Sequence, residues 1–308
     1  MCLLPLSGLY WLGWKAYRHI YKLGIKKAYV SKNLVICVGN FTVGGSGKSP
    51  AVRTIATDLA TLGYPVVIGC SGYGSPRSEA ATVAPEGNLD AREWGDEPAM
   101  LRQWLPNLPI IVGRDRVLAA QLAEQHFPDS ILLMDDGLQH LRLEPQIQIA
   151  LWTPISNPYV LPAGPYREPP RWLEVDLVLS RPFRLARTLQ APQPKTEAAS
   201  ELGKTVQSLA GIAHPYLFFE PLEAAGFELV KVLSLPDHFQ FTSGTLAESF
   251  EPSLPILVTE KDWTKLKEIP DIQKWQIWAV PENVTIEPQD EFRSWLRKTI
   301  ETKLSKKV

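Results

Sequence analysis

Eight residues near the start of the chain have the types and the order of a phosphate-binding loop. They read Thr42-Val43-Gly44-Gly45-Ser46-Gly47-Lys48-Ser49. Glycines let backbone N–H groups turn toward phosphate oxygens, and the N-terminus of a following helix adds a positive dipole. Lys48 would reach the β- and γ-phosphates of a nucleoside triphosphate, and the Ser49 hydroxyl would bind Mg²⁺. Thr42 departs from the pattern, which expects glycine at that position. The alternative interpretation of the whole segment is a glycine-rich turn that binds no ligand.

Acidic pairs that could bind Mg²⁺ or a reacting hydroxyl occur at two further places. Asp135 and Asp136 end the apolar run Ile131–Met134, and P-loop proteins hold Mg²⁺ with a carboxylate at such a strand end. The alternative for this pair is an ordinary acidic turn. In the second pair, Asp96 and Glu97, one carboxylate can act as a base and the other as a metal ligand. Sequence alone favours the alternative that Asp96 caps a helix.

A histidine and several arginines add candidates for proton transfer and anion binding. His238 could carry a proton, although a lone histidine is more often structural. Arg167 ends a stiff proline-rich segment, and Arg114 and Arg116 follow the apolar run Pro109–Val112. Guanidinium groups bind phosphate or carboxylate through two hydrogen bonds, so these arginines could contact substrate or nucleotide. Each of them can equally be a surface residue.

The elements that must position these groups alternate between apolar runs and helical patterns. Six runs predict buried strands: Leu34–Val38, Pro65–Gly69, Pro109–Val112, Ile131–Met134, Ile147–Trp152 and Asp176–Leu179. Helical spacing marks Ser49–Leu62 and Arg116–His126. The alternation predicts an α/β fold, a doubly wound P-loop NTPase-type sheet that is mainly parallel and flanked by helices.

The chain is long enough for two domains, and its composition changes near residue 190. We predict an N-terminal amphipathic helix over residues 1–33, a P-loop domain over 34–190, a linker over 191–204 and a smaller α/β domain over 205–308. The last domain is expected to end with a helix over Asp290–Lys303. Cys37 and Cys70 fall inside strand-like runs, which argues against a disulfide framework or a zinc site.

The N-terminal segment has an uneven charge. Residues 1–34 contain six basic residues and no acidic one, whereas the whole chain is nearly balanced with 32 basic and 33 acidic residues. Because the net charge is nearly zero, the chain has no overall positive field that would favour a nucleic acid as partner. As a helix, this segment has an aromatic-rich apolar face beside a basic face, which suits the surface of an anionic membrane. The alternative is a helix packed on its own domain with solvated lysines.

Taken together, the motifs resemble the tetraacyldisaccharide 4′-kinase family, the lipid A kinases of Gram-negative bacteria. The matching segments, which follow the family's order over nearly the whole chain, are Val38–Pro50, Gly72–Gly74, Gly95–Pro98, Asp135–His140, Leu161–Glu168, Gly211–Pro215, Asp237–His238 and Thr259–Asp262. Thr42 at the head of the loop is also usual in that family. The resemblance implies a kinase that uses ATP and Mg²⁺ to phosphorylate the 4′-hydroxyl of an acylated glucosamine disaccharide 1-phosphate, giving lipid IVA. It also implies a peripheral location on the cytoplasmic face of the inner membrane.

The resemblance also implies roles for individual residues. Asp96 matches the catalytic aspartate, and His238 matches the histidine that pairs with it. Glu97 and Asp136 match carboxylates in the magnesium environment, and Asp135 and Ser49 complete the expected metal ligands. The residues expected to contact substrate are Tyr73, Arg114 and Arg167. Because Asp96 and His238 lie in different predicted domains, domain closure is expected to assemble the site.

The sequence departs from the family before Gly72, where Cys70-Ser71 stands in place of Ser-Arg. The guanidinium of that arginine is absent, and Arg77 is near enough in sequence to compensate. Two alternative functions stay open, of which only the second is motivated by Ser71. One is a P-loop ATPase or GTPase that acts as a switch, and the other is a member of the kinase family with weakened activity.

Overall fold

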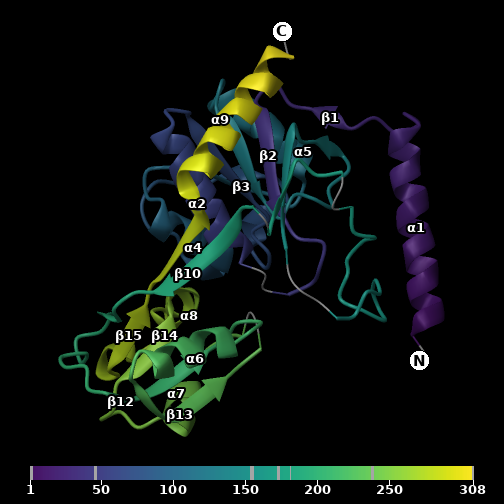
Figure 1. The fold of residues 1–308 in the computed structure, drawn as a ribbon. Coiled ribbons are helices and arrows are strands. Elements are labelled where there is room, and N and C mark those ends of the chain that lie inside the picture. The colour runs from purple at the N-terminus through teal and green to yellow at the C-terminus, as the bar shows by residue number, and fades with distance from the viewer. Residues whose placement is uncertain are drawn as a thin grey trace. The chain divides into compact units, whose positions relative to one another are not determined.

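The computed structural model describes residues 3–44, 47–152, 156–171, 174–180, 182–236 and 239–306. The chain divides into two compact units, one formed by residues 1–186 and 285–308 and the other by residues 187–284. Both boundaries fall within a two-stranded sheet made of β10 (Arg184–Leu189) and β16 (Glu282–Glu287), so the chain passes between the units there (Figure 1).

A seven-stranded sheet forms the centre of the first unit. Its strands, in order across the sheet, are β4 (Thr82–Val83), β5 (Ile110–Val112), β3 (Val66–Cys70), β6 (Ile131–Asp135), β2 (Leu34–Gly39), β8 (Ile147–Leu151) and β9 (Leu177–Leu179). All neighbouring strands are parallel except β4 and β5. Every residue of β2, β3, β5 and β6 is buried, as expected for strands covered on both faces. The predicted mainly parallel sheet is confirmed.

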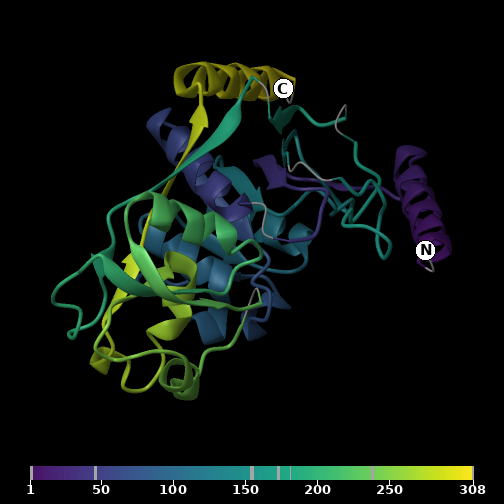
Figure 2. The same cartoon turned by 60° about the horizontal axis from the view of Figure 1, so that its bottom comes forward.

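Helices cover both faces of this sheet. They are α2 (Lys48–Thr61), α3 (Ala91–Trp94), α4 (Asp96–Trp104), α5 (Arg116–His126) and α9 (Gln289–Ser305). Alternate residues of β2 point to opposite faces: Ile36 belongs to the core under α2, α4 and α9, whereas Val35 belongs to the core under α5. Figure 2 shows the same arrangement from a second direction. The first unit is therefore doubly wound, as predicted.

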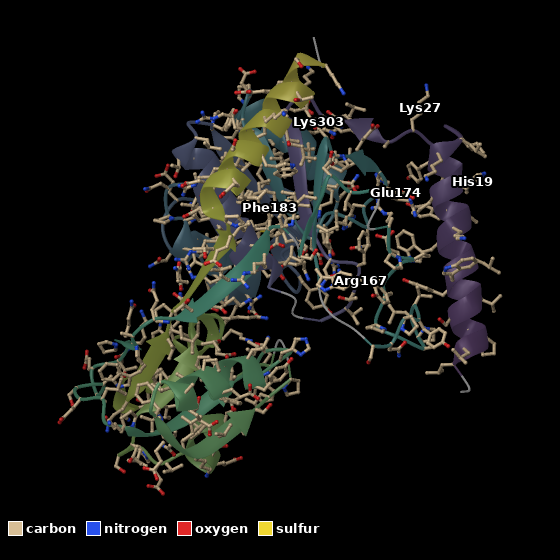
Figure 3. The ribbon with its side chains drawn as sticks, viewed as in Figure 1. His19, Lys27, Arg167, Glu174, Phe183 and Lys303 are labelled. Carbon is tan, nitrogen blue, oxygen red and sulfur yellow. The ribbon has the colours of Figure 1, made fainter. Side chains whose placement is uncertain are left out.

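The last helix, α9, belongs to the first unit although it follows the second in sequence. Its residues Phe292, Leu296 and Ile300 join the core of the first unit, and the Phe292 ring lies 5.6 Å from the Phe183 ring. Phe183 is labelled in Figure 3. Lys303 Nζ also lies 2.9 Å from Asp176 Oδ1. The units therefore differ from the predicted boundaries, which assign this helix to the smaller domain and place a linker at 191–204. An apolar stripe shows that a helix is buried, but not which core receives it.

The N-terminal helix α1 (Leu4–Lys22) stands at the side of the first unit (Figure 1). Its inner side is held by Ser7, which is buried and donates to the Val160 carbonyl at 2.7 Å, and by Arg18, which pairs with Glu174. Its exposed apolar side chains include Leu4, Leu6, Leu9, Trp11 and Leu12, and Leu3 at the N-cap is exposed as well. The predicted basic face is thus partly engaged, since Arg18 and Lys22 both pair with Glu174. None of the helices formed by described residues has the length and apolarity needed to cross a bilayer.

The segment after α1 contacts β7 and α5 of the first unit. Within it, β1 (Tyr29–Val30) pairs in parallel with β7 (Leu143–Glu144). Glu124 of α5 accepts hydrogen bonds from the Tyr29 hydroxyl, the Ser31 hydroxyl and the Lys32 N–H. The chain is therefore fixed by these contacts before it enters β2.

The second unit contains a five-stranded sheet with helices on both faces. Its strands, in order, are β11 (Gln193–Pro194), β15 (Ile277–Val280), β14 (Ile256–Thr259), β12 (Thr205–Ala210) and β13 (Glu228–Ser234). Only β11 and β15 pair in an antiparallel manner among these. The helices are α6 (Tyr216–Ala224), α7 (Ser243–Ser249) and α8 (Glu260–Leu266). Leu246 of α7 and Leu266 of α8 share one core, and Phe218 of α6 lies in the other.

Candidate functional site

The phosphate-binding loop joins the end of β2 to α2, as the motif requires. Gly44 and Gly47 have φ angles of 99° and 78°, in the left-handed region that favours glycine. Thr42 is buried, and the Val43 N–H donates to the Pro165 carbonyl at 2.8 Å. That N–H is therefore engaged with the protein rather than turned toward a phosphate. Gly45 and Ser46, also predicted to bind the nucleotide, lie outside the described residues.

Ser49, in the first turn of α2, faces the end of β6. Its hydroxyl donates to Asp135 Oδ2 at 2.9 Å, and Asp135 is 1% exposed. Burial, together with the negative charges of Glu97 and Asp136, raises the pKa of Asp135 to about 7, although Lys48 and the Ser49 hydrogen bond act in the opposite direction. The buried carboxylate can therefore exchange a proton near neutral pH unless a cation is bound beside it.

Asp136 lies in a different electrostatic setting. Lys48 Nζ is 3.8 Å from Asp136 Oδ2, and Arg167 Nη1 donates to the same oxygen at 2.7 Å. Burial alone would raise the pKa of Asp136, but the positive charges of Lys48 and Arg167 outweigh it and hold the pKa below its ordinary value. Asp136 also has a φ of 57°, an uncommon conformation for a residue other than glycine.

Arg116 holds the main chain of this acidic pair. The side chain is buried, and its Nη2 donates to the Asp135 carbonyl at 2.7 Å and to the Asp136 carbonyl at 3.4 Å. Its Nη1 donates to the Gly113 carbonyl at 3.3 Å. Arg116 thus links the ends of β5 and β6 through main-chain carbonyls. Arg114, in contrast, has an exposed side chain, and its N–H donates to the Ser78 carbonyl.

The segment Leu161–Arg167 lies against the start of the phosphate-binding loop and is called the loop wall below. Arg167 N donates to the Phe41 carbonyl at 2.7 Å, and Thr42 forms a bridge with Tyr166. On its other side, the Arg167 carbonyl accepts a 2.5 Å hydrogen bond from the hydroxyl of Tyr10 in α1. Figure 3 shows Arg167 between the sheet and α1. Arg167 is therefore fixed by groups from three parts of the first unit.

A buried polar network lies directly after the loop wall in sequence. Glu168 is fully buried, accepts from Gln139 Nε2 at 3.0 Å and pairs with Arg171 at 3.3 Å. Arg171 also donates to the Leu138 carbonyl at 2.7 Å. Sequence reasoning did not single out Gln139 or Arg171. The only signal was that Gln139 lies within the segment that begins with the acidic pair.

Asp96 and Glu97 begin α4 close to the loop that carries Tyr73. Gly95 is the N-cap and has a φ of 91°, so Asp96 is the first residue of the helix and not its cap, contrary to the alternative favoured by sequence. A side chain at position 95 would come within 3.2 Å of the Tyr73 carbonyl, which explains the glycine. Asp96 and Glu97 are half-buried, whereas Tyr73 is 65% exposed.

Ser71 and Arg77 occupy the neighbourhood of this helix start. The Ser71 hydroxyl lies 3.5 Å from Glu97 Oε2. Arg77 Nε donates to Glu93 at 2.9 Å, and its guanidinium lies over the Trp94 ring. Among the described contacts, Arg77 is thus engaged with Glu93 and Trp94 and does not replace a guanidinium at position 71.

Asp135 and Asp136 offer carboxylate oxygens suited to Mg²⁺, and phosphate oxygens and water would have to supply the remaining ligands. Asp135 Oδ1 and Asp136 Oδ1 are buried and have no hydrogen-bond partner among the described residues. Carboxylate and hydroxyl oxygens are ligands that Mg²⁺ prefers, and it commonly combines one or two of them with phosphate oxygens and water. The described part of the chain contains no group of three or more acidic, histidine or cysteine residues that could hold a metal without such help.

The predicted histidine belongs to the second unit. His238 and its neighbour Asp237 lie outside the described residues. The residues on either side, Pro236 and Phe239, are described, and Phe239 N donates to the Pro236 carbonyl at 3.2 Å. The Thr259-to-Asp262 motif forms a helix cap, since the Thr259 hydroxyl accepts from Asp262 N at 3.0 Å.

Comparison with known proteins gives a consistent result. Residues 1–301 match the family model described as tetraacyldisaccharide-1-P 4′-kinase. A tetraacyldisaccharide 4′-kinase of Aromatoleum aromaticum is 35% identical over 299 residues, covering 89% of this chain and 87% of that protein. The corresponding protein of Chromobacterium violaceum is 32% identical, with coverage of 98% and 94%.

One solved structure has the same fold. It is LpxK from Aquifex aeolicus, an "apo" form described as in complex with ATP, and it matches with a TM-score of 0.77. The match covers 97% of this chain and 98% of that chain at 23% sequence identity. The structural likeness supports the fold, and the sequence comparisons identify the family.

Proposed function

The chain belongs to the tetraacyldisaccharide-1-P 4′-kinase family, and we propose that it transfers the γ-phosphate of ATP to the 4′-hydroxyl of an acylated glucosamine disaccharide 1-phosphate. The product is lipid IVA. The observation that carries the proposal is the cluster where Lys48 and Ser49 lie against Asp136 and Asp135. Phosphoryl transfer depends mainly on positioning and charge stabilisation, which such a cluster supplies. Membership of a kinase family removes the reason to favour a switch ATPase.

In the proposed reaction, the phosphates of ATP bind between the loop and the acidic pair. Lys48 moves its ammonium from Asp136 to the β- and γ-phosphates, because a phosphate oxygen at short range attracts it more strongly than the carboxylate does. Ser49, Asp135 and Asp136 would hold Mg²⁺, with Glu97 nearby. The ion neutralises charge on the phosphates when it is bound. Arg167 remains available to the transferring group because its guanidinium has further N–H donors.

Asp96 is the proposed base. It begins α4, where the helix dipole stabilises a carboxylate, and it is half-buried beside the Tyr73 loop. The carboxylate accepts the proton of the 4′-hydroxyl as the sugar oxygen attacks the γ-phosphorus and ADP leaves. His238 is proposed to hydrogen-bond to Asp96 and orient it. Tyr73 and Arg114, both exposed, are proposed to contact the acceptor.

The lipid acceptor requires the enzyme to work at a membrane. The exposed leucines of α1, of which Leu9 is 67% and Leu12 is 56% exposed, support insertion of this helix into the surface of an anionic bilayer. Lys15 and Lys22 would lie near the lipid headgroups. We propose a peripheral position on the cytoplasmic face of the inner membrane.

The proposed reaction is tested by measuring phosphorylated lipid with purified protein, ATP and the tetraacyl disaccharide 1-phosphate. Asp96→Asn should lower kcat by about 10²- to 10⁴-fold, with the KM for ATP nearly unchanged, because it removes the base but not the phosphate site. A wild-type rate in Asp96→Asn would exclude the proposed base. Ser71→Arg tests the weakened-kinase alternative, which predicts a rise in activity of about tenfold.

The membrane proposal has its own test. The doubly substituted variant Leu9→Glu/Leu12→Glu should no longer co-sediment with vesicles of phosphatidylethanolamine and phosphatidylglycerol, whereas nucleotide binding should persist. Leu118→Glu, which replaces a 43% exposed leucine of α5, is the matched control and should sediment normally. Unchanged vesicle binding by the double variant would contradict the role of α1.

A further inference from the structure

The turn that carries Tyr73 is attached to the chain segment just before Asp96 by a buried hydroxyl group. Ser75, which is 6% exposed, donates from Oγ to the Glu93 carbonyl at 2.7 Å. Glu93 lies near the end of α3, where main-chain carbonyls have no partner inside the helix. Ser75 therefore supplies a hydrogen bond that the end of this helix requires.

Ser75 also closes the turn itself. Its N–H donates to the Gly72 carbonyl at 2.8 Å, so Tyr73 lies at the tip of a four-residue turn. The Ser75 hydroxyl accepts from Arg77 N at 3.0 Å, at the start of the short helix Pro76–Ser78. The hydroxyl thus donates to α3 and accepts from its own loop. A movement of Ser75 therefore moves the backbone of Tyr73 with it.

The other end of this attachment lies close to Asp96. Only two residues separate Glu93 from Asp96. One of them, Trp94, is 7% exposed, and the other, Gly95, donates from N to the Ala91 carbonyl at 2.9 Å. Because the intervening main chain is held in this way, a displacement of the Glu93 carbonyl passes to the first residue of α4. Displacements of about 1 Å at groups that orient a reacting atom can lower rates about 100-fold.

The turn and the start of α4 also pack backbone against backbone. A Cβ atom on Gly95 would lie 3.2 Å from the Tyr73 carbonyl oxygen. One on Gly72 would lie 3.3 Å from the Trp94 carbonyl oxygen. Both glycines have positive φ, 91° and 59°, so other residues would be strained at these positions. The position of Tyr73 relative to Asp96 is therefore set by these main-chain contacts together with the hydroxyl bond.

An ion pair joins the same two segments, but it contributes less. Arg77 Nε donates to Glu93 Oε1 at 2.9 Å, and the two side chains are 52% and 43% exposed. Exposed ion pairs contribute little to stability because water and salt screen them. The hydrogen bond from the buried Ser75 hydroxyl is therefore the stronger constraint on Glu93.

From this geometry we infer that Ser75 is a positioning residue for the acceptor side of the site. Its hydroxyl holds the base, Asp96, and the acceptor contact, Tyr73, at a fixed separation. The inference rests on the roles proposed above for these two residues. Ser75 itself touches neither ATP nor the acceptor in this account. The phosphate-binding loop lies between β2 and α2, so nucleotide binding should not depend on Ser75.

The experiment measures lipid phosphorylation by full-length Ser75→Ala. Its kcat should fall by about tenfold and its KM for the lipid should rise by about three- to tenfold, because Asp96 and Tyr73 both lose their fixed position. The KM for ATP should change by less than about twofold. A merely structural role would lower the amount of folded enzyme, and therefore the apparent kcat, without raising the KM for the lipid.

Ser78→Ala is the matched control. The Ser78 hydroxyl is also buried, at 2% exposure, and it donates to the Ser75 carbonyl at 2.8 Å. The substitution removes a similar hydrogen bond from the same loop and should shift the melting temperature similarly, but it leaves the bond to α3 in place. Its kcat and both KM values should stay within about twofold of wild type. Equal kinetics in Ser75→Ala and Ser78→Ala would overturn the inference.

A double-mutant cycle with Asp96→Asn separates this inference from the proposed function. In the Asp96→Asn background, Ser75→Ala should lower kcat by less than about twofold, because the base that it positions is gone. A full tenfold fall in that background would overturn the inference alone. A wild-type rate in Asp96→Asn would refute the proposed base and this inference with it. If Ser75→Ala fails to fold, Ser75→Cys, with a thiol that donates weakly, should show a smaller loss with the same rise in lipid KM.

Discussion

Both units place charged side chains near the ends of parallel strands, half-buried in the first unit and buried in the second, but the charges have different partners. In the first unit, Lys48 lies against the carboxylate of Asp136, and Arg167 donates to the same carboxylate. In the second unit, Asp262 and Lys265 bind main-chain N–H and carbonyl groups. Ion pairs can exchange partners when a phosphate arrives, whereas side chains bound to the backbone keep their partners. The first arrangement suits ligand binding, and the second suits the positioning of a loop.

The largest effect is expected from removing an exchangeable charge. Lys48→Met should lower kcat by about 10³-fold or more, because it removes the ammonium proposed to stabilise the charge on the transferring phosphate. Its effect on unfolding should stay within about 0.5 kcal/mol, because the 3.8 Å contact with Asp136 is long. Kinetics and thermal melts measure both quantities, with Lys298→Met on exposed α9 surface as control. A large loss of stability would show that Lys48 is structural.

Arg116 lies in the first unit but binds main-chain carbonyls, so it should behave like the backbone-bound charges of the second unit. Arg116→Met should lower stability by about 2–4 kcal/mol, since the Asp135 carbonyl loses its charged donor in a buried place. The kcat should fall by about 10- to 100-fold because the acidic pair shifts. Urea unfolding followed by kinetics checks both expectations. Loss of activity with unchanged stability would place Arg116 among the ligand-binding charges instead.

Asp135 links stability to pH. Its pKa is near 3.9 in an unfolded chain and is raised to about 7 in the folded protein, so the folded protein binds the extra proton between these values. The contribution of Asp135 to the free energy of unfolding should therefore fall as pH rises from about 4 to about 7. Without nucleotide and metal, Asp135→Asn should be about 1–3 kcal/mol more stable than wild type at pH 8, with no such gain at pH 4. A gain that is equal at both pH values would contradict the shifted pKa.

The smallest effect is expected at the contact between α1 and the loop wall. Tyr10→Phe removes the hydroxyl that donates to the Arg167 carbonyl, and it should cost about 0.5–1.5 kcal/mol of stability. The KM for ATP should rise by no more than about threefold. Tyr64→Phe, at a half-buried tyrosine after α2, is the matched control. A tenfold rise in KM would mean that α1 controls the phosphate site more strongly than one hydrogen bond can explain.

Much of the first unit could be predicted because local patterns determine it. The apolar runs that became β2, β3 and β6 are buried on both faces, and Gly44 and Gly47 of the loop take positive φ as the motif requires. The roles of Arg116 and Lys265 could not be predicted, because each depends on a carbonyl far away in sequence. The apolar residues along one face of α9 likewise predict that the helix is buried, but they do not predict which of the two units it packs against.

The central claim is that the cluster at the ends of β2 and β6 transfers phosphate to a lipid acceptor and does not simply hydrolyse ATP. The most direct measurement is the rate of ADP formation by wild-type protein with and without the tetraacyl disaccharide 1-phosphate, combined with mass spectrometry of the lipid. We predict that ADP forms at an appreciable rate only with the lipid and that each ADP corresponds to one phosphate on the 4′-hydroxyl. Equal ADP formation without the lipid, or an unmodified lipid, would contradict this account.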